Sequence, residues 1–114
     1  MIVANWKANG DIKKNYLWCE TFQNLLDKSS FNYVGISPSH IHFHQLNTFF
    51  KETNVMIGMQ DIYIEGGAIT GSISAEMASA DGCSFCLVGH SERREIFNED
   101  GNLISKKISS LLKN

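Results

Sequence analysis

Short apolar runs alternate along the chain with longer stretches in which apolar residues recur every three or four positions. The short runs predict strands, and the periodic stretches predict helices with one buried face. The predicted strands are 1–6, 31–37, 55–60 and 84–88. The predicted helices are 12–26, 41–50, 75–80 and 103–112.

The predicted strands are apolar almost throughout and do not alternate cleanly between apolar and polar residues. Such runs are typical of parallel strands that are covered on both faces. Strands that alternate with helices favour successive βαβ units with right-handed crossovers. The sequence therefore predicts an α/β fold of four βα units, which form a single domain over residues 1–114.

Polar residues stand at the ends of the predicted strands, where α/β folds gather their chemistry. They are Asn5, Lys7, Ser37, Gln60, Asp61, Gly89 and His90. We expect these residues to contribute to one site. Asn5 and Lys7 point to the same side of their strand and Trp6 to the other. An amide and an ammonium on one face could hold an oxyanion or a phosphate, although a solvated strand end would look the same.

His90 follows an apolar strand and directly precedes a predicted helix start. The positive end of the helix dipole and the nearby charges of Arg93 and Arg94 both disfavour an imidazolium. A neutral imidazole could donate a hydrogen bond to a carbonyl group and act as an electrophile. The alternative is a structural histidine bonded to the backbone. The charged block 92–95 could likewise be an ordinary salt-bridged helix face, which would add little stability.

Two patterns invite a redox or metal interpretation, and both are weak. Cys83 and Cys86 match C-x-x-C, but residues three apart in a strand face opposite ways, so we expect the two thiols to diverge. No second cysteine pair completes a zinc site. His40 and His44 share a helix face without the glutamate of a zinc motif, so we expect surface histidines there.

The loop 66–71 is rich in glycine but lacks the register of a nucleotide-binding loop. An apolar Ile69 within it suits a loop that docks against a partner subunit.

The chain has 114 residues, of which 43% are hydrophobic and 19% charged, with a net charge of −2. This balance gives no indication of a nucleic-acid or membrane partner. We recognise no signal peptide and no apolar stretch long enough to span a bilayer. The odd number of cysteines, three, favours a reducing compartment. We therefore expect a cytoplasmic protein.

Three motifs together resemble the triosephosphate isomerase family: NWKANG at 5–10, GAITG at 67–71 and GHSERR at 89–94. Their order and spacing match the N-terminal half of that family along essentially the whole chain. The resemblance implies that residues 1–114 are the first four βα units of a (β/α)8 barrel.

The resemblance also implies an aldose–ketose isomerase of glycolysis and gluconeogenesis, without cofactor or metal. Such an enzyme interconverts dihydroxyacetone phosphate and glyceraldehyde 3-phosphate through an enediolate. His90 would be the neutral electrophile, a role already known for this family. Lys7 would stabilise the anionic substrate, and Glu92 would be the carboxylate associated with that lysine.

Further roles follow from the same resemblance. Asn5 would contact the substrate, and Ser91 would lie beside the histidine in the site. Thr70 would reach into the neighbouring subunit of a homodimer. Two residues depart from the family pattern: Asp61 stands where an asparagine is usual, and Ser72 stands where a glutamate is usual.

A complete barrel of this kind needs about 250 residues. The family's general base is a glutamate of the second half, and nothing in residues 1–114 matches it. We therefore expect the 114-residue chain to be inactive on its own. The alternative function is a catalytically inactive half-barrel that binds phosphate or associates with itself through its open edges and uncovered inner face.

Overall fold

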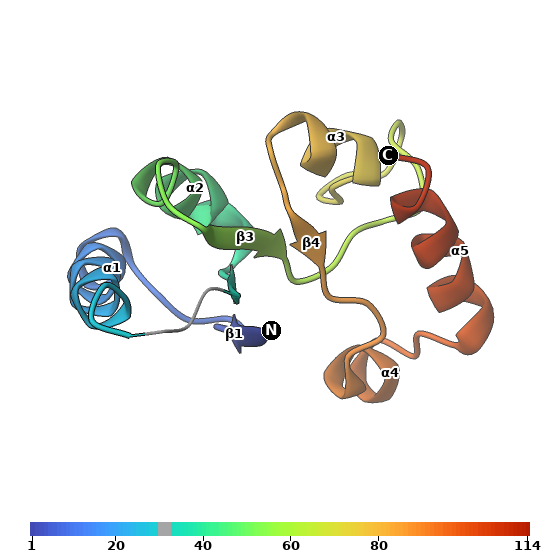
Figure 1. The fold of residues 1–114 in the computed structure, drawn as a ribbon. Helices are drawn as coiled ribbons and strands as arrows, with labels where there is room; N and C mark the ends of the chain where they lie inside the picture. The colour runs from blue at the N-terminus through green and yellow to red at the C-terminus, as the bar shows by residue number, and fades with distance from the viewer. Residues whose placement is uncertain (30–32) are drawn as a thin grey trace.

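The computed structural model describes residues 1–29 and 33–114. Four parallel strands form one sheet in the order β1-β2-β3-β4 (Figure 1). The strands are β1 (Ile2–Asn5), β2 (Val34–Ser37), β3 (Val55–Met59) and β4 (Phe85–Cys86). Neighbouring strands pair in chain order, with Ile2 beside Val34 and Gly58 beside Phe85. This topology confirms the predicted α/β class and its successive βα units.

Helices α1, α2 and α3 follow one another along one side of the sheet, and α4 lies on the other side (Figure 1). The helices are α1 (Ile12–Leu26), α2 (Phe43–Phe49), α3 (Ala75–Ala80), α4 (Ser91–Ile96) and α5 (Gly101–Leu111), and a short 3-10 turn, η1 (His40–His42), precedes α2. Among these described helices none is long and apolar enough to span a bilayer.

Local signals explain where the longer helices begin. The Asp11 carboxylate accepts the N–H of Lys14 at 2.9 Å and so caps α1. The Asp100 carboxylate accepts the N–H of Leu103 at 2.8 Å and caps α5 in the same way. Each cap satisfies one of the backbone donors that the first turn of a helix leaves unpaired.

The strands are shorter than their apolar runs predicted. The prediction for the second strand began at Phe31, which lies outside the described residues, and all four residues of β2 are buried. The last strand contains only Phe85 and Cys86, although Ser84 and Leu87 still donate N–H bonds to β3. Burial of whole strands confirms that both faces of the sheet's middle are covered.

The main core lies between the sheet and the helices. Ile36 and Ile57 of the sheet pack there with Leu46 and Phe50 of the α2 region. On the opposite, inner face the Phe85 ring covers the sheet. A Cβ at Gly58 would lie 2.5 Å from this ring, and a Cβ at Gly35 would lie 2.8 Å from it. The inner face is therefore covered over β2 and β3, which the prediction of a wholly uncovered inner face did not anticipate.

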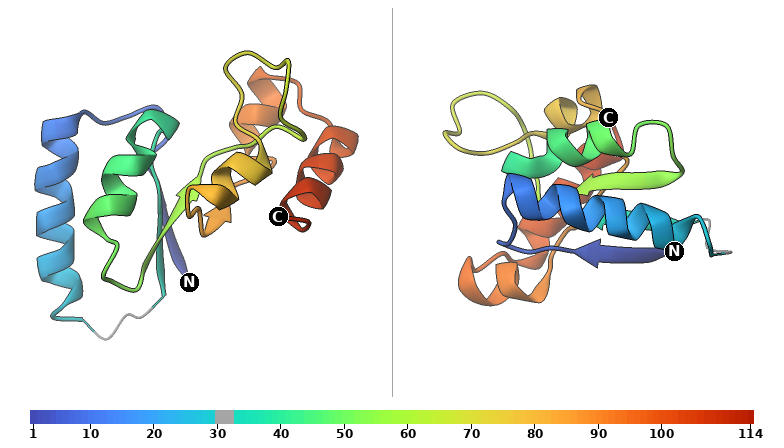
Figure 2. Two further views of the ribbon diagram at one scale, coloured as in Figure 1. Left: turned by 90° about the horizontal axis from the view of Figure 1, so that it is seen from above. Right: turned by 90° about the vertical axis from the view of Figure 1, so that its left-hand side faces the viewer.

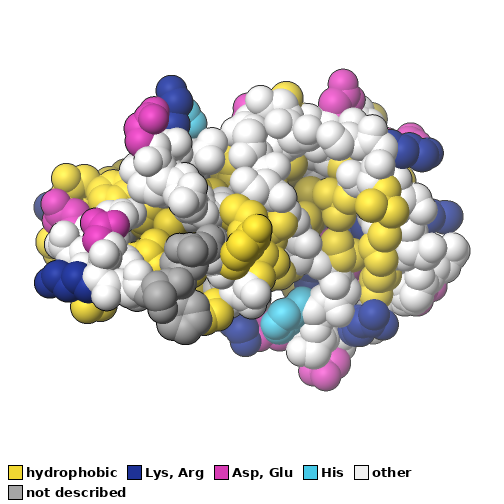
Figure 3. Space-filling view, in the orientation of Figure 1, with side chains coloured by type: hydrophobic (Ala, Val, Ile, Leu, Met, Phe, Trp, Pro, Cys, Tyr) yellow, Lys and Arg dark blue, Asp and Glu magenta, His cyan; other side chains and the backbone are white. Residues whose placement is uncertain are grey.

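The two edges of the sheet carry exposed apolar side chains. Met1 is 72% exposed and Ile2 is 53% exposed beside the edge strand β1. A groove of about 600 Å³ runs beside β4 and is lined by apolar residues that include Phe85, Ile108 and Leu112. Figure 3 shows hydrophobic side chains in the middle of the molecule, as seen in the orientation of Figure 1, and toward α5.

Candidate functional site

The carboxyl ends of the strands meet at one edge of the sheet and surround a cavity of about 430 Å³. Its lining includes Asn5 and Lys7 after β1, His40 after β2, Gln60 after β3, and His90 and Glu92 after β4. Figure 2 shows these ends on the side where the loop after β3 projects. Of the seven strand-end residues expected to share a site, Asn5, Lys7, Gln60, Asp61 and His90 line this cavity, and Ser37 and Gly89 do not.

Asn5 and Lys7 lie on the cavity side of their strand end, whereas Trp6 lies on the helix side. The Trp6 and Trp18 rings meet edge to face with their centroids 4.9 Å apart. The Asn5 side-chain oxygen accepts the backbone N–H of Lys7 at 3.0 Å. The Lys7 ammonium lies 2.6 Å from a carboxylate oxygen of Glu92, 85 residues further along the chain. The segments that follow the two edge strands, β1 and β4, therefore each contribute one side chain to this ion pair.

The Lys7–Glu92 pair is open to solvent, with about half of the Lys7 side chain and 44% of the Glu92 side chain exposed. The hydrogen bond from Lys7 lowers the pKa of the Glu92 carboxyl, with smaller help from the charge of Lys7. An exposed pair adds little to stability. Its consequence is that Glu92 stays charged and that a cation is held at the mouth of the cavity.

His90 caps α4 with its ring. The Nδ1 atom accepts the backbone N–H of Glu92 at 3.3 Å, which requires a lone pair on Nδ1 and leaves the proton of a neutral ring on Nε2. The same Nδ1 lies 3.4 Å from a Glu92 carboxylate oxygen, a contact that would need a proton on Nδ1. We favour the acceptor role, because Lys7 already engages that carboxylate.

The sequence interpretation placed Arg93 and Arg94 near the positive end of the helix that follows His90. Since α4 has only six residues, both arginines fall in its last turn, where positive charge is favourable. Arg94 Nε donates to the Gly89 carbonyl oxygen at 2.8 Å and so closes the turn that carries His90.

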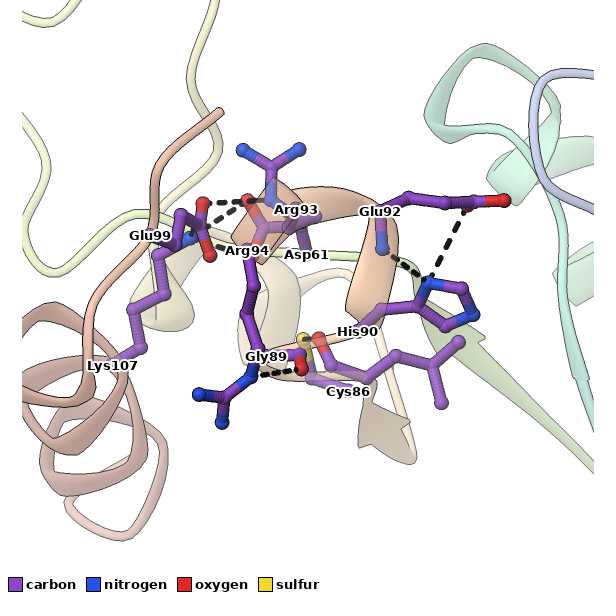
Figure 4. Close-up of polar contacts among 10 residues, drawn as sticks. Asp61, Cys86, Gly89, His90, Glu92, Arg93, Arg94, Glu99 and Lys107 are labelled. Carbon is purple, nitrogen blue, oxygen red and sulfur yellow. Dashed lines mark hydrogen bonds and ion pairs between the residues drawn. The ribbon is translucent and has the colours of Figure 1, made fainter. Parts of the chain in front are cut away.

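Four charged side chains form a cluster beside the cavity, which we call the ion cluster: Asp61, Arg93, Glu99 and Lys107. Asp61 and Arg93 also line the cavity. Arg93 Nε lies 2.9 Å from an Asp61 oxygen and 2.7 Å from a Glu99 oxygen. Lys107 Nζ lies 2.7 Å from Asp61 and 2.6 Å from the same Glu99 oxygen. Figure 4 shows Arg93 and Asp61 between Glu99 and Lys107 on one side and His90 and Glu92 on the other.

The ion cluster takes one residue, Arg93, out of the charged block that could have been a surface helix face, whereas Arg94 and Glu95 are exposed. Glu99 and Lys107 are buried, at 6% and 1% exposure. Burial alone raises the pKa of the Glu99 carboxyl, but hydrogen bonds from Lys107 and Arg93 outweigh it and leave that pKa below its usual value. The cluster joins the end of β3, α4 and α5, and so fixes the helix that carries His90 and Glu92.

The remaining residues implied by the resemblance lie outside the cavity. Ser91 is exposed at the first position of α4 and is absent from the cavity lining. Thr70 is exposed on the projecting loop (Figure 2). The structure thus brings together Asn5, Lys7, His90 and Glu92, and leaves Ser91 and Thr70 apart from them.

Of the three histidines after β2, His44 is exposed as predicted, whereas His40 and His42 are less exposed. His42 is buried at 8% exposure, with Nε2 at 3.3 Å from the Gly10 carbonyl oxygen, so the expectation of a surface residue is wrong for it. His40 is half-buried and faces the cavity, and burial lowers the pKa of its ring. Within residues 1–29 and 33–114, no group of three or more histidine, cysteine or acidic side chains is arranged to hold a metal ion.

The thiols of the C-x-x-C pattern are engaged with the backbone. Cys83 Sγ donates to the Phe85 carbonyl oxygen at 2.9 Å, and Cys86 Sγ donates to the Leu87 carbonyl oxygen at 3.2 Å. Burial raises the pKa of the Cys86 thiol to about 12, whereas a redox thiol needs a lowered pKa. These contacts argue against thiol chemistry at this position.

Comparisons with known proteins agree in one family. The family model described as triosephosphate isomerase matches residues 1–114. A triosephosphate isomerase of Aquifex aeolicus is 36% identical over 113 residues, which cover 98% of this chain and 46% of that protein. One of Legionella pneumophila (strain Paris) is 33% identical over 108 residues, which cover 94% of this chain and 43% of that protein. The chain therefore spans less than half the length of these relatives.

Proposed function

Because this chain belongs to the triosephosphate isomerase family, we propose that it carries the electrophilic part of an active site that interconverts dihydroxyacetone phosphate and glyceraldehyde 3-phosphate. In this proposal residues 1–114 are one domain, the first half of a (β/α)8 barrel. The observation that carries the proposal is the meeting of Lys7, Glu92 and His90 at one cavity, from opposite edges of the sheet.

Each residue has a role in forming the enediolate. When a base removes a proton from the carbon beside the substrate carbonyl, negative charge develops on the carbonyl oxygen. His90, with its proton on Nε2, donates a hydrogen bond to that oxygen. The Lys7 ammonium attracts the anionic substrate and is itself oriented by Glu92 and Asn5. Asn5 and Ser91 complete the proposed substrate contacts.

We also propose a homodimer in which the loop that carries Thr70 reaches the cavity of a second copy. The loop is exposed over residues 65–72, and the cavity it would meet is open to solvent. The reaction belongs to glycolysis and gluconeogenesis and uses no cofactor, and the three free cysteines suit the cytoplasm.

Binding of dihydroxyacetone phosphate tests the site directly. We expect NMR titration to shift the signals of Lys7 and His90, and Lys7→Met to weaken binding by roughly tenfold to a hundredfold, because a hydrogen bond to a charged group is lost. The matched control is Lys51→Met, which removes an exposed lysine near the opposite ends of the strands. Equal affinity in the two variants would contradict the proposed role of Lys7.

The open edges of the sheet support a second candidate, a self-associating module. Among the strands that the structure describes, β1 and β4 each have no partner on one side, and Ile2 is exposed on β1. We expect sedimentation to detect species larger than the monomer, and Ile2→Lys to shift them toward the monomer, since a charge at a sheet edge opposes pairing. Leu17→Lys, at an exposed apolar position on α1, serves as the control. A monomer at every concentration would exclude this candidate.

A further inference from the structure

Lys7 has a backbone conformation that residues with side chains rarely adopt. Its φ of 54° lies in the left-handed region, and it is one of two non-glycine residues with positive φ among those described. Such a conformation costs about 1–3 kcal/mol and persists only where the surroundings hold it. The contacts that hold Lys7 therefore decide where its ammonium lies.

Both backbone groups of Lys7 are bonded by side chains. Its N–H donates to Asn5 at 3.0 Å. Its carbonyl oxygen accepts two bonds, from Gln60 Nε2 at 2.8 Å and from Ser39 Oγ at 2.9 Å. The three side chains come from the ends of β1, β3 and β2, so the sheet itself holds the strained residue.

Ser39 stands at a position where a serine hydroxyl ordinarily caps the helix that follows. It is the N-cap of η1, and serine at an N-cap usually accepts a backbone N–H of the first turn. Here the side chain makes no such bond. The hydroxyl is instead directed at the Lys7 carbonyl oxygen, with the Asn9 carbonyl oxygen further away at 3.4 Å. A capping bond has thus been replaced by a bond across the site.

We propose that Ser39 is a positioning residue for Lys7: its hydroxyl holds the Lys7 backbone in the left-handed conformation that places the ammonium against Glu92. Without the hydroxyl, the carbonyl oxygen of Lys7 keeps only the bond from Gln60, and the residue can relax toward an ordinary φ. The ammonium then moves away from Glu92 and from the cavity.

The inference rests on the proposed function for the importance of Lys7, but its test does not need substrate. Glu92 reports on the lysine, because the hydrogen bond from Lys7 lowers the pKa of its carboxyl. Ser39 makes no hydrogen bond or ion pair to Glu92 among the described contacts. A change in the Glu92 titration caused by Ser39 must therefore pass through Lys7.

The experiment is an NMR titration of the Glu92 carboxyl in the 114-residue chain and its variants. Lys7→Met removes the hydrogen bond to Glu92 completely, so it is expected to raise the Glu92 pKa by the largest amount, with which the Ser39 variants are compared. Ser39→Ala should raise it in the same direction by a smaller amount, and Ser39→Thr, which keeps the hydroxyl, should leave it near the wild-type value. Ser79→Ala is the matched control, because it removes a hydroxyl that donates to a backbone carbonyl at 3.0 Å far from Glu92.

Three results would overturn the inference. The first is a Glu92 pKa in Ser39→Ala equal to that of the wild type while Lys7→Met raises it. The second is an equal rise in Ser39→Ala and Ser79→Ala, which would indicate a general loss of structure. The third is no rise in Lys7→Met, which would mean that the ion pair does not form. If dihydroxyacetone phosphate fails to bind but Ser39→Ala still moves Glu92, the proposed function fails and the positioning role stands.

Discussion

A Lys107→Met variant is expected to lose about 3–5 kcal/mol of its free energy of unfolding, because it leaves two carboxylates of the ion cluster with a single cation between them. The Lys107 ammonium bonds both Asp61 and Glu99 and is itself 1% exposed. After the substitution the two carboxylates share Arg93 alone. Denaturant unfolding followed by circular dichroism measures the loss. Lys106→Met, at the exposed neighbouring position on α5, should change stability little.

A second substitution distinguishes charge imbalance from a simple loss of packing. In the Lys107→Met background, Glu99→Gln removes one of the two carboxylate charges that compete for Arg93 and should recover part of the lost stability. In the wild type the same change removes a partner of both cations and should destabilise. Additive losses in the double variant would contradict the role assigned to the ion cluster.

The pH dependence of unfolding provides a further measurement on the same variants. The pKa of Glu99 is lower in the folded chain than its usual value, so its contribution is present above that usual value and is lost as the pH falls through the folded pKa. Without Lys107 the folded pKa rises, because burial is then opposed by Arg93 alone. The window between the usual pKa and the folded pKa therefore narrows, and the acid-induced loss of stability that Glu99 contributes should be smaller in Lys107→Met than in the wild type.

Patterns among neighbouring residues were sufficient to predict the order of the elements and half of the site. Apolar runs bounded by turn residues located all four strands, and the alternation of side chains in a strand placed Asn5 and Lys7 opposite Trp6. These features depend on neighbouring residues alone. The same is true of His90, whose place directly before α4 follows from the end of one apolar run and the start of a charged block.

Features that depend on distant partners were not predictable in the same way. Helical spacing of apolar residues predicted one apolar face for α1, yet Ile12 and Leu25 of that face are 71% and 63% exposed. Only a narrower face that includes Cys19 and Phe22 reaches the core, because the sheet and α2 offer that helix a limited surface.

The ion cluster illustrates both what could have been noticed and what could not. Lys107 lies three residues after Ile104 and four before Leu111, so it falls on the apolar face of α5, and that spacing alone indicates a buried lysine. Its partner Asp61 lies 46 residues away. Which carboxylates meet the lysine is decided by how α5 packs beside the end of β3, and local patterns do not contain that packing.

The 114-residue chain is expected to convert dihydroxyacetone phosphate at least about 10²–10⁴-fold more slowly than its full-length relatives, the contribution usually made by a positioned general base. The carboxylate beside His90 is a poor substitute for that base. Lys7 holds Glu92 at 2.6 Å and lowers its pKa, which weakens it as a proton acceptor. Asp61 and Glu99 are engaged in the ion cluster. A coupled assay at saturating substrate measures the rate.

The electrophile should remain functional even though turnover is slow, and a soluble carboxylate can reveal it. If only the base is missing, added acetate should increase the rate of the wild-type chain, because it can remove the proton while His90 stabilises the enediolate. His90→Gln should abolish this increase, whereas His44→Gln, at an exposed position on α2, should retain it. Turnover close to that of the relatives would disprove the assignment of a missing base. An acetate effect that survives in His90→Gln would disprove the role of the histidine.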